Sequence, residues 1–234
     1  MPKVRLFFQE KIKKSKKIFP SFHQIHYLKN VMRKKDGDKI FIFDGEEEWS
    51  ASLKVNKKIS IFPTKLLRTK SLVQDIWICF GLVKLKNINT LIEKVTEIGT
   101  KKFYPLATKF SEKINLNFDR LEKIIIESVE QSNALSVPIL EKTINIRDFL
   151  KDWDEERVIV FCDERSGGKK ISTLPLGKYK KFAIFVGPVG GWSNEDLSLF
   201  ENKKNFFKVT LGANILKADT AAIYSLSCLK NFLM

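Results

Sequence analysis

Histidine is scarce in this sequence of 234 residues, and most of the chain has none. The only two histidines are His23 and His26, so a Ser-His-Asp triad is excluded from everything that follows residue 26. The pair has an H-x-x-H spacing, but a metal site needs more ligands than these two. The sequence therefore predicts no metal centre.

Cysteine is also rare, and long hydrophobic runs are lacking. The cysteines Cys79, Cys162 and Cys228 lie far apart and form no C-x-x-C pair, which argues against a disulfide scaffold and a cysteine zinc site. No apolar run approaches the roughly 18 residues that a membrane span needs. The stretch Leu6-Phe7-Phe8 is too short for the core of a signal peptide. We expect a soluble, cytoplasmic protein with no membrane partner.

Acidic residues are outnumbered, because 27 Asp and Glu stand against 42 Lys and Arg and give a net charge of +15. Such an excess is typical of nucleic-acid-binding proteins, although a lysine-rich coding bias also produces it. The excess is uneven. Residues 1–70 hold 18 basic and 7 acidic residues, whereas residues 71–234 hold 24 and 20. We therefore expect the first 70 residues to bind nucleic acid.

The candidate phosphate-binding residues lie near the start of the chain, and a merely solvated loop is the alternative interpretation. Lysines and arginines that neutralise phosphates release counterions, which makes affinity fall with salt. The candidates are Arg5, Lys11, Lys13, Lys14, Lys16, Lys17, Arg33 and Lys34. The aromatic residues among them are expected in the core rather than as stacking platforms; they are Phe7, Phe8, Phe19, Phe22 and Tyr27.

Residues 1–70 have the pattern of a small β-rich domain. Ser21 can cap a helix over residues 22–32, and Asp44-Gly45 is a hairpin turn signal. Several short strands within about 65 residues suggest a small barrel. The expected strands are residues 3–8, 39–43, 48–55 and 58–62.

From residue 71 onward, apolar runs alternate with helical periodicity. This rhythm predicts an α/β domain with a mostly parallel sheet over residues 71–234. Carboxylates on one helix, Glu127 and Glu130, are either a solvated face or an acid–base pair. The expected strands are residues 75–82, 103–107, 137–140, 158–162, 182–186 and 206–210, and the expected helices are 87–98, 118–133, 146–153, 194–201 and 219–232.

Two segments between a strand and a helix could bind a ligand. The first, which we call the glycine loop (residues 187–191), reads Gly-Pro-Val-Gly-Gly and is followed by the capping pair Ser193 and Asp196. Ligands of open α/β sheets sit beyond the carboxyl ends of strands, where glycines allow a close approach. The loop matches neither G-x-G-x-x-G nor the P-loop pattern. A tight turn without a ligand is the alternative.

The second, which we call the apolar segment (residues 211–221), reads Leu-Gly-Ala-Asn-Ile-Leu-Lys-Ala-Asp-Thr-Ala. It is longer than the two to six residues usual between a strand and a helix, and it is apolar for a surface loop. These features favour a lining for a flat apolar ligand such as adenine. A plain helix cap at Asp219 or Thr220 is the alternative.

Taken in order, these segments resemble the ribosomal RNA small subunit methyltransferase E family, which belongs to the SPOUT superfamily. That family writes the glycine loop as GPEGG(F/W)S and the apolar segment as LG-x-RILR-x-ETA. Residues 91–99 (LIEKVTEIG), 127–138 (ESVEQSNALSVP) and 26–37 (HYLKNVMRKKDG) are similar to further family segments. This chain departs from the motifs at Val189 (Glu in the family), Asn214 and Lys217 (both Arg) and Asp219 (Glu).

The resemblance implies a trefoil-knotted α/β methyltransferase domain over residues 71–234, a PUA-like domain over residues 1–70, and a homodimer. It implies S-adenosylmethionine as methyl donor, S-adenosylhomocysteine as product, and N3 of a uridine in 16S rRNA, in assembled small ribosomal subunits, as target. On this basis Lys84 and Lys86 are expected near the RNA. The cofactor-binding residues are expected to be Phe161, Cys162, Gly187, Pro188, Gly190, Gly191, Leu211, Gly212, Ile215, Leu216, Thr220 and Ala221.

The same resemblance suggests roles for three charged residues. Lys217 is expected to stabilise charge on the uracil oxygens or to bind the cofactor carboxylate, and Asp219 or Glu130 to take the N3 proton. Two other functions stay open. One is a non-catalytic RNA- or ribosome-binding protein that kept the fold. The other is a SPOUT methyltransferase acting on another RNA site, such as a tRNA guanine or a ribose hydroxyl.

Overall fold

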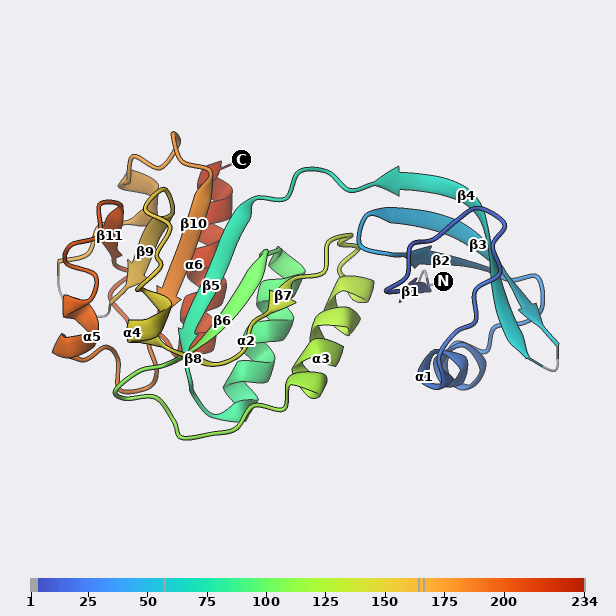
Figure 1. The fold of residues 1–234 in the computed structure, drawn as a ribbon, viewed down its shortest axis with the longest axis horizontal. Helices are drawn as coiled ribbons and strands as arrows, with labels where there is room; N and C mark the ends of the chain where they lie inside the picture. Colours follow the sequence, from blue (N-terminus) through green and yellow to red (C-terminus); the bar gives the residue numbers. More distant parts are fainter. Residues whose placement is uncertain (1–3, 57, 164, 166, 234) are drawn as a thin grey trace. The chain divides into compact units, whose positions relative to one another are not determined.

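The computed structural model describes residues 4–56, 58–163, 165 and 167–233 (Figure 1). The chain divides into two compact units, which we treat separately. The first contains residues 1–73 together with 129–137, and the second contains residues 74–128 and 138–234. These units differ from the domains expected from the sequence mainly because residues 129–137 belong with the N-terminal residues.

The first unit is a four-stranded sheet with the order β1-β2-β3-β4. Strands β1 and β2 are parallel, and the other neighbours are antiparallel. A capping box at Ser21 starts α1 (Phe22–His26), which continues as the π-helical η1 (Tyr27–Val31), so the helix expected over residues 22–32 is confirmed but changes type. The strands are β1 (Arg5–Phe7), β2 (Lys39–Phe43), β3 (Glu47–Val55) and β4 (Ile59–Thr69).

The core of this sheet comes from alternating apolar residues. Ile40 and Ile42 of β2 and Ala51 and Leu53 of β3 point inward, as the period of two for a half-buried strand requires. The pairing of β3 with β4 shifts register on both sides of Trp49 and Ser50. Such bulges increase local twist and bend a strand, which lets a small sheet curve around its core.

A buried ion-pair network ties residues 129–137 to this sheet. The Glu48 carboxylate accepts hydrogen bonds from Nε of Arg5 at 2.6 Å and from Nε of Arg68 at 2.5 Å. Arg5 also donates to the carbonyls of Val129 and Ala134, both at 2.8 Å, and its guanidinium lies 4.5 Å from the Phe43 ring centroid. The network uses most of the Arg5 donors within the unit.

This arrangement corrects one expectation from the sequence. Arg5 was expected to contact RNA, but it is buried and its charge is paired with Glu48. Of the other cations expected to bind phosphate near the N-terminus, those from Lys11 to Lys17 and Arg33 are exposed, whereas Lys34 is half-buried and lies 4.0 Å from the Asp38 carboxylate. Arg5 therefore belongs to the core of the first unit and not to its cationic surface.

Replacing Glu48 by Gln should destabilise the protein by about 3 kcal/mol, because one partner of a buried ion pair is removed and Arg5 stays buried. Burial raises the pKa of Glu48, but hydrogen bonds from Arg68 and Arg5 outweigh it and hold that pKa below its ordinary value of 4.5. The depressed pKa contributes stability at neutral pH that is lost as the pH falls through it. The measurement is urea unfolding from pH 7 to pH 3.

The matched control is Glu46→Gln, which removes an exposed ion pair with Lys70 and should change the free energy of unfolding by under about 1 kcal/mol. The gap between wild type and Glu48→Gln should be widest near pH 7 and narrow below about pH 4.5. A gap that stays constant over this range would contradict an electrostatic role for Glu48.

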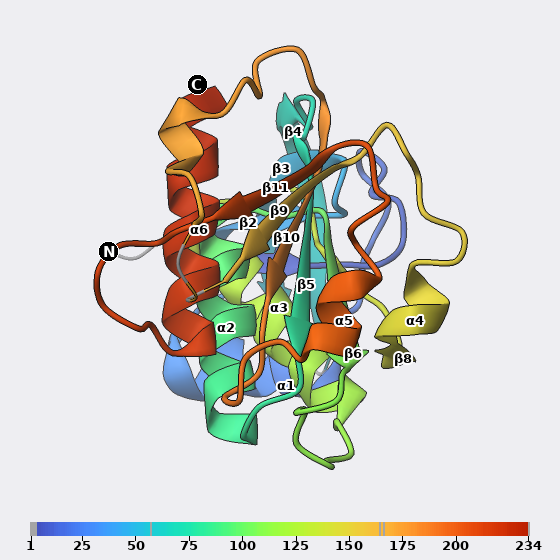
Figure 2. The ribbon, with the colours of Figure 1, turned by 90° about the vertical axis from the view of Figure 1, so that its left-hand side faces the viewer.

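The second unit is built on a parallel sheet with the order β11-β9-β10-β5-β6-β7, with β8 paired to β6. Figure 2 shows α2 and α6 together on one face of the sheet and α4 and α5 on the other. The strands are β5 (Asp75–Gly81), β6 (Lys102–Ala107), β7 (Ile139–Leu140), β8 (Ile144–Asn145), β9 (Val158–Cys162), β10 (Lys181–Val186) and β11 (Phe206–Val209). The helices are α2 (Leu85–Ile98), α3 (Phe118–Gln131, whose last three residues belong to the first unit), α4 (Ile146–Phe149), α5 (Asn194–Ser198) and α6 (Ala218–Leu233); a short 3-10 turn, η2, covers Ile171–Thr173.

The expected alternation of strands and helices is thus confirmed, with α4 and α5 shorter than the sequence indicated. Strand β9 is buried along its whole length and β10 from Phe182 onward, as both faces of a parallel sheet are covered. Among the described residues, none of the helices has the length and apolar composition to cross a membrane.

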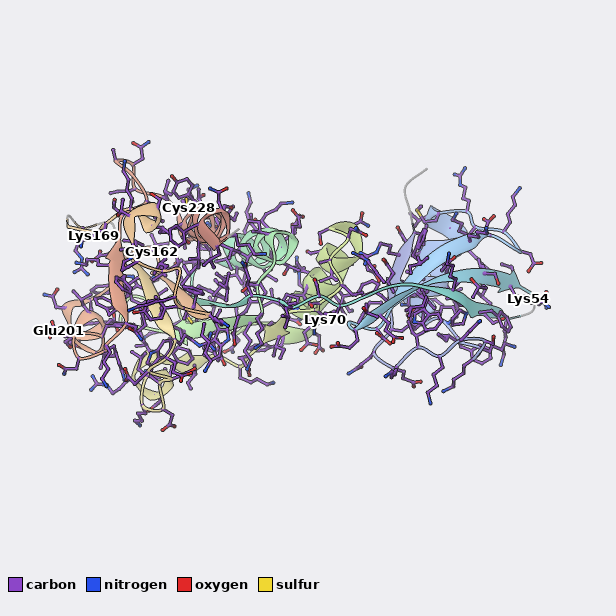
Figure 3. All side chains as sticks on the ribbon, turned by 90° about the horizontal axis from the view of Figure 1, so that it is seen from above. Lys54, Lys70, Cys162, Lys169, Glu201 and Cys228 are labelled. Carbon is purple, nitrogen blue, oxygen red and sulfur yellow. The ribbon has the colours of Figure 1, made fainter. Side chains whose placement is uncertain are left out.

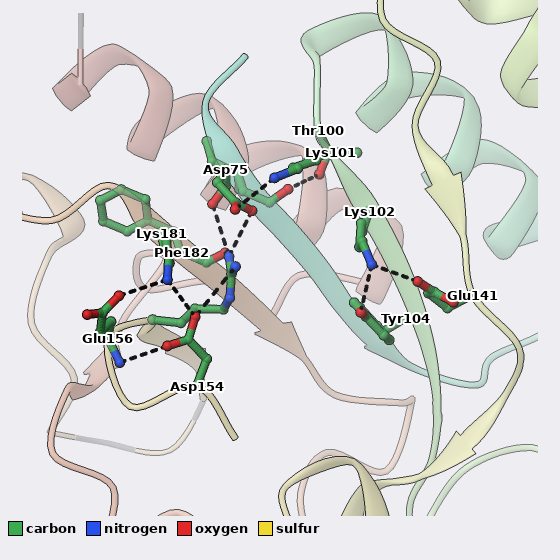
Figure 4. A network of polar contacts seen from close by, with 12 residues as sticks. Asp75, Thr100, Lys101, Lys102, Tyr104, Glu141, Asp154, Glu156, Lys181 and Phe182 are labelled. Atoms are coloured by element: carbon green, nitrogen blue, oxygen red, sulfur yellow. Dashed lines mark hydrogen bonds and ion pairs between the residues drawn. The ribbon is translucent and has the colours of Figure 1, made fainter. Parts of the chain in front are cut away.

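The amino ends of the central strands are joined by charged side chains (Figure 4). The buried Arg157 precedes β9 and donates to the Asp75 carboxylate at 3.0 Å and to the Phe182 carbonyl at 3.1 Å, with its guanidinium 3.5 Å from the Trp77 ring centroid. At the surface beside it, Lys181 pairs with Asp154 at 3.1 Å. These contacts link β5, β9 and β10 at one end and fix their relative register.

Candidate functional site

A cavity of about 620 Å³ opens at the opposite end of this sheet, where four strands finish side by side. Val186, the last residue of β10, pairs with Phe80 of β5 and Cys162 of β9, and Cys162 pairs with Val209 of β11. The segments that follow these strands therefore meet. The lining residues are Val83, Lys84, Asn87, Glu112, Cys162, Asp163, Val186–Val189, Gly191, Trp192, Thr210–Ala218 and Ala221.

The glycine loop is held close to the sheet by two tight contacts, and the one at Gly81 leaves no room for a side chain. A Cβ atom at Gly81, the end of β5, would lie 2.5 Å from Cδ of Pro188. A Cβ atom at Gly187 would lie 3.1 Å from the indole nitrogen of Trp192. The close approach of Pro188 to β5 therefore requires glycine at position 81, whereas a Cβ atom at Gly187 would require the Trp192 indole to shift by a few tenths of an ångström.

Trp192 anchors the far side of the same loop. Its indole N–H donates to the Cys162 carbonyl at 3.0 Å, and its ring packs against Phe161 with centroids 4.8 Å apart. The predicted capping box is confirmed, because Asp196 N–H donates to the Ser193 hydroxyl at 3.0 Å and the Asp196 carboxylate accepts from Ser193 N–H at 3.1 Å. The loop is therefore fixed at both ends while its backbone faces the cavity.

The apolar segment forms the other wall and leads into α6. Residues 210–218 all line the cavity, including Lys217, and the Ala221 N–H donates to the Lys217 carbonyl at 2.7 Å, which starts the helix. Asp219 accepts a hydrogen bond from the Asn87 amide at 3.3 Å. Lys217 therefore lines the cavity, and Asp219 directly follows the lining residue Ala218.

A buried carboxylate that the sequence did not single out lies beneath the cavity. Asp163 follows β9 and pairs with Arg165 and Lys208, both at 2.9 Å. Burial raises the pKa of Asp163, but hydrogen bonds from Arg165 and Lys208 outweigh burial and keep it below its ordinary value, so the group is ionised at neutral pH. Its position directly after a predicted buried strand was the available signal.

Most residues expected to bind a cofactor do line this cavity. Nine of the twelve line it: Cys162, Gly187, Pro188, Gly191, Leu211, Gly212, Ile215, Leu216 and Ala221. Gly190 instead lies against Phe110, and Thr220 is exposed on α6. The expectation that the Phe161 side chain contacts the cofactor is corrected, since this side chain is fully buried among Phe185, Trp192 and Phe200.

The remaining predicted residues divide between the two units. Lys84 lines the cavity, and Lys86 is exposed on α2. Glu130 belongs to the first unit, where its carboxylate accepts from the Phe7 N–H at 2.8 Å. That contact gives Glu130 a structural partner, so the structure does not support it as a proton acceptor. Sequence reasoning missed the cavity-lining Glu112, which follows β6.

The cavity offers backbone groups, apolar surface and a few charges. Cys162 lies within the second unit (Figure 3), and burial raises the pKa of its thiol to about 12, so it is not a nucleophile at neutral pH. Within the described residues, no group of three or more His, Cys, Asp or Glu side chains could hold a metal ion. The site is therefore suited to holding a partly apolar organic ligand against fixed backbone.

Comparison with known proteins assigns the family. Residues 70–230 match the family described as RNA methyltransferase domain, and residues 21–62 match the RNA methyltransferase PUA domain. A protein of Rickettsia conorii named "Ribosomal RNA small subunit methyltransferase E" is 30% identical over 95% of this chain and 93% of its own length. The chain belongs to the ribosomal RNA small subunit methyltransferase E family. A Bacillus subtilis member of the same name is 27% identical over 95% of this chain and 94% of its own length.

Solved structures show the same fold. A ribosomal RNA small subunit methyltransferase E from Neisseria gonorrhoeae, bound to S-adenosyl methionine, superposes with a TM-score of 0.86 at 21% identity over 98% of both chains. A methyltransferase from Legionella pneumophila, in complex with the same cofactor, also gives 0.86 at 21% identity, over 99% of this chain and 98% of its own. The expected parallel-sheet methyltransferase fold with an N-terminal PUA-like domain is confirmed.

Replacing Gly81 by Ala should push Pro188 and the glycine loop away from the sheet, because the new methyl group would overlap Pro188 backbone and ring atoms. We expect the free energy of unfolding to fall by about 2 kcal/mol, within the range for overpacked sites. The measurement is urea unfolding at pH 7. Gly177→Ala is the control, because a Cβ atom there meets nothing within 4 Å, and an equal loss in both variants would contradict the close-approach argument.

Proposed function

We propose that this protein methylates N3 of a uridine in 16S ribosomal RNA, giving 3-methyluridine, with S-adenosylmethionine as the methyl donor. The observation that carries the proposal is the convergence of the glycine loop and the apolar segment on one cavity within a family of ribosomal RNA methyltransferases. These are the two segments whose sequences carry the family resemblance. We place the reaction in the cytoplasm and on the assembled small subunit.

The cavity fits the proposed cofactor. Its volume of about 620 Å³ lies within the usual range for small-molecule sites. Leu211, Ile215 and Leu216 supply apolar surface for an adenine ring, and the glycine loop supplies backbone groups. Asp163, ionised at the base of the site, can accept hydrogen bonds from ribose hydroxyls or attract a positive charge.

Methyl transfer to uracil N3 sets two requirements for the protein. S-adenosylmethionine supplies an electrophilic methyl group, so the uracil N3 needs to be positioned in line with it and to lose its proton. Lys217 can stabilise the negative charge that develops on the uracil oxygens. The N3 edge is hidden in a base pair or stack, so the target uridine must be unpaired or extruded.

We assign proton acceptance to Glu112, with Asp219 as the alternative. Asp163 is held by Arg165 and Lys208, and Asp219 by Asn87, whereas the Glu112 residue lines the cavity and is exposed. The family motif has a glutamate where this chain has Val189. Glu112 restores a carboxylate to the same cavity from a different segment.

Two further properties belong to the proposal. The exposed cations of residues 11–17 and Arg33 would hold rRNA phosphates, leaving base selection to the second unit. The chain would act as a trefoil-knotted homodimer, as the family resemblance implies. The exposed apolar side chains of Val189 and Ile215 fit a pairing surface beside the cavity.

Incubation with labelled S-adenosylmethionine and small ribosomal subunits that lack the modification should produce 3-methyluridine. The RNA is digested and its nucleosides are identified by mass spectrometry. Lys217→Ala should bind the methyl donor but lose at least tenfold in rate, because one electrostatic contact to the developing charge is removed.

Other products would support the alternative functions. A different methylated nucleoside would keep the enzyme class and change the target. Cofactor binding without label in any RNA would support a non-catalytic RNA-binding protein. Equal rates for wild type and Lys217→Ala would contradict the charge-stabilising role of Lys217.

Binding of rRNA fragments should weaken steeply with salt. If the first unit neutralises about four phosphates, the slope of log affinity against log salt should be roughly −3, using the single-strand coefficient. Replacing Lys13, Lys14, Lys16 and Lys17 by Gln should move this slope toward zero by about 0.7 for each phosphate that is no longer neutralised. Filter binding between about 50 and 300 mM salt provides the measurement.

The control removes the same charge from the second unit, where Lys123, Lys170, Lys178 and Lys180 are exposed. Their replacement by Gln should leave the slope nearly unchanged, since they lie outside the basic N-terminal segment. Equal effects of the two quadruple variants would show that overall charge, rather than the first unit, governs binding.

A further inference from the structure

Two large aromatic side chains of the first unit lie on its surface, contrary to the expectation that they belong to the core. Phe22 is 80% exposed and Phe19 is 59% exposed. Phe8 and Tyr27, from the same expected set, do pack against the core, and Phe7 packs against Phe43 at 5.5 Å. Phe19 and Phe22 are therefore not among the residues that form this core.

The backbone around these two rings is held on both sides. Ile18 pairs with Ile61 of β4 through two backbone hydrogen bonds of 2.9 Å, just before Phe19. Ser21 forms the capping box with Gln24 just before Phe22, and the Gln24 amide donates to the Phe7 carbonyl at 2.9 Å. The short chain between these anchors presents both rings from a defined backbone.

The surroundings of the rings are exclusively basic in sequence. Residues 11–35 contain nine Lys and Arg and no Asp or Glu. The Lys17 ammonium lies 4.9 Å from the Phe19 ring centroid, and the His23 ring meets Phe22 edge-on at 6.1 Å. An acidic protein surface could pair with such charges, but it would not explain two exposed planar rings. Unpaired RNA supplies both phosphates and flat bases.

We propose that Phe19 and Phe22 form a stacking platform for unpaired bases of the RNA substrate, with the neighbouring lysines on its phosphates. This inference rests on the proposed function, since it assumes an RNA substrate. Every base has a π-face, so the platform would bind single strands without reading sequence. Its role is to hold the strand that flanks the target and to discriminate against duplex.

The test compares the full-length wild type with Phe22→Ala and the Phe19→Ala/Phe22→Ala pair. Fluorescence anisotropy measures affinity for a single-stranded uridine-rich oligonucleotide and for a duplex of the same length. We expect Phe22→Ala to lose about tenfold in affinity for the single strand, as one stacked base is lost, and under twofold for the duplex. The slope against salt should not change, because no charge is removed. Phe22→Trp, which keeps an aromatic ring at this position, should bind the single strand with about the wild-type affinity.

Leu72→Ala is the matched control, because Leu72 is fully exposed in the same unit and has no flat ring. Melting temperatures verify that each variant is folded. Wild-type affinity in Phe22→Ala, equal losses on single strand and duplex, or no single-strand binding by the wild type would each overturn the platform.

The two proposals can fail separately. If the wild type produces no 3-methyluridine but Phe22→Ala still weakens single-strand binding, the platform stands and the proposed reaction does not. If 3-methyluridine forms and Phe22→Ala binds both RNAs like the wild type, the reaction stands and the platform does not.

Discussion

The common register of four parallel strands is the constraint on which the candidate site depends. Phe80, Val186, Cys162 and Val209 lie in one row across β5, β10, β9 and β11. Because the strands run in the same direction, the segments that follow them leave the sheet at one edge. A slip of one residue in any pair would move buried side chains to the opposite face of the sheet and disrupt the packing there. Arg157 opposes such a slip from the other end, where it bonds to β5 and β10 at once.

The walls of the site also depend on close packing beside the shared edge. Pro188 lies against Gly81 at a distance that leaves no place for a Cβ atom, and Trp192 lies tightly against Gly187. The Trp192 indole then fastens the glycine loop to the Cys162 carbonyl. A cavity with rigid walls results, which limits the entropy that is lost when a ligand binds.

The features that could be predicted from the sequence are those that depend on neighbouring residues. Apolar runs and capping residues predicted nearly every strand and helix, and the composition of two loops predicted both walls of the cavity. In a strand that is apolar throughout, the sequence does not show which face of the sheet each side chain points to. Phe161 is therefore expected at the cofactor site together with Cys162, although its ring lies in the aromatic core. Distant partners are not local either. Arg5 is buried because a carboxylate and carbonyls come to it from far along the chain. The opposite holds for Phe19 and Phe22, which are expected in the core and are exposed. Their hydrophobicity does not show that other residues already fill the core.

The departures from the family motifs fall where the fold tolerates them. Backbone groups and packed rings shape the cofactor side of the cavity, and neither depends on the side chain at Val189 or Asn214. In the proposed reaction, the reacting side depends on charge. Lys217 would act there as a point charge without the planar fork of arginine, which suffices for charge developing on an oxygen but not for bidentate recognition. A carboxylate is still available at the cavity in Glu112. If the protein methylates RNA as proposed, binding and chemistry rely on different kinds of group, and these substitutions should then affect catalytic rate more than cofactor affinity.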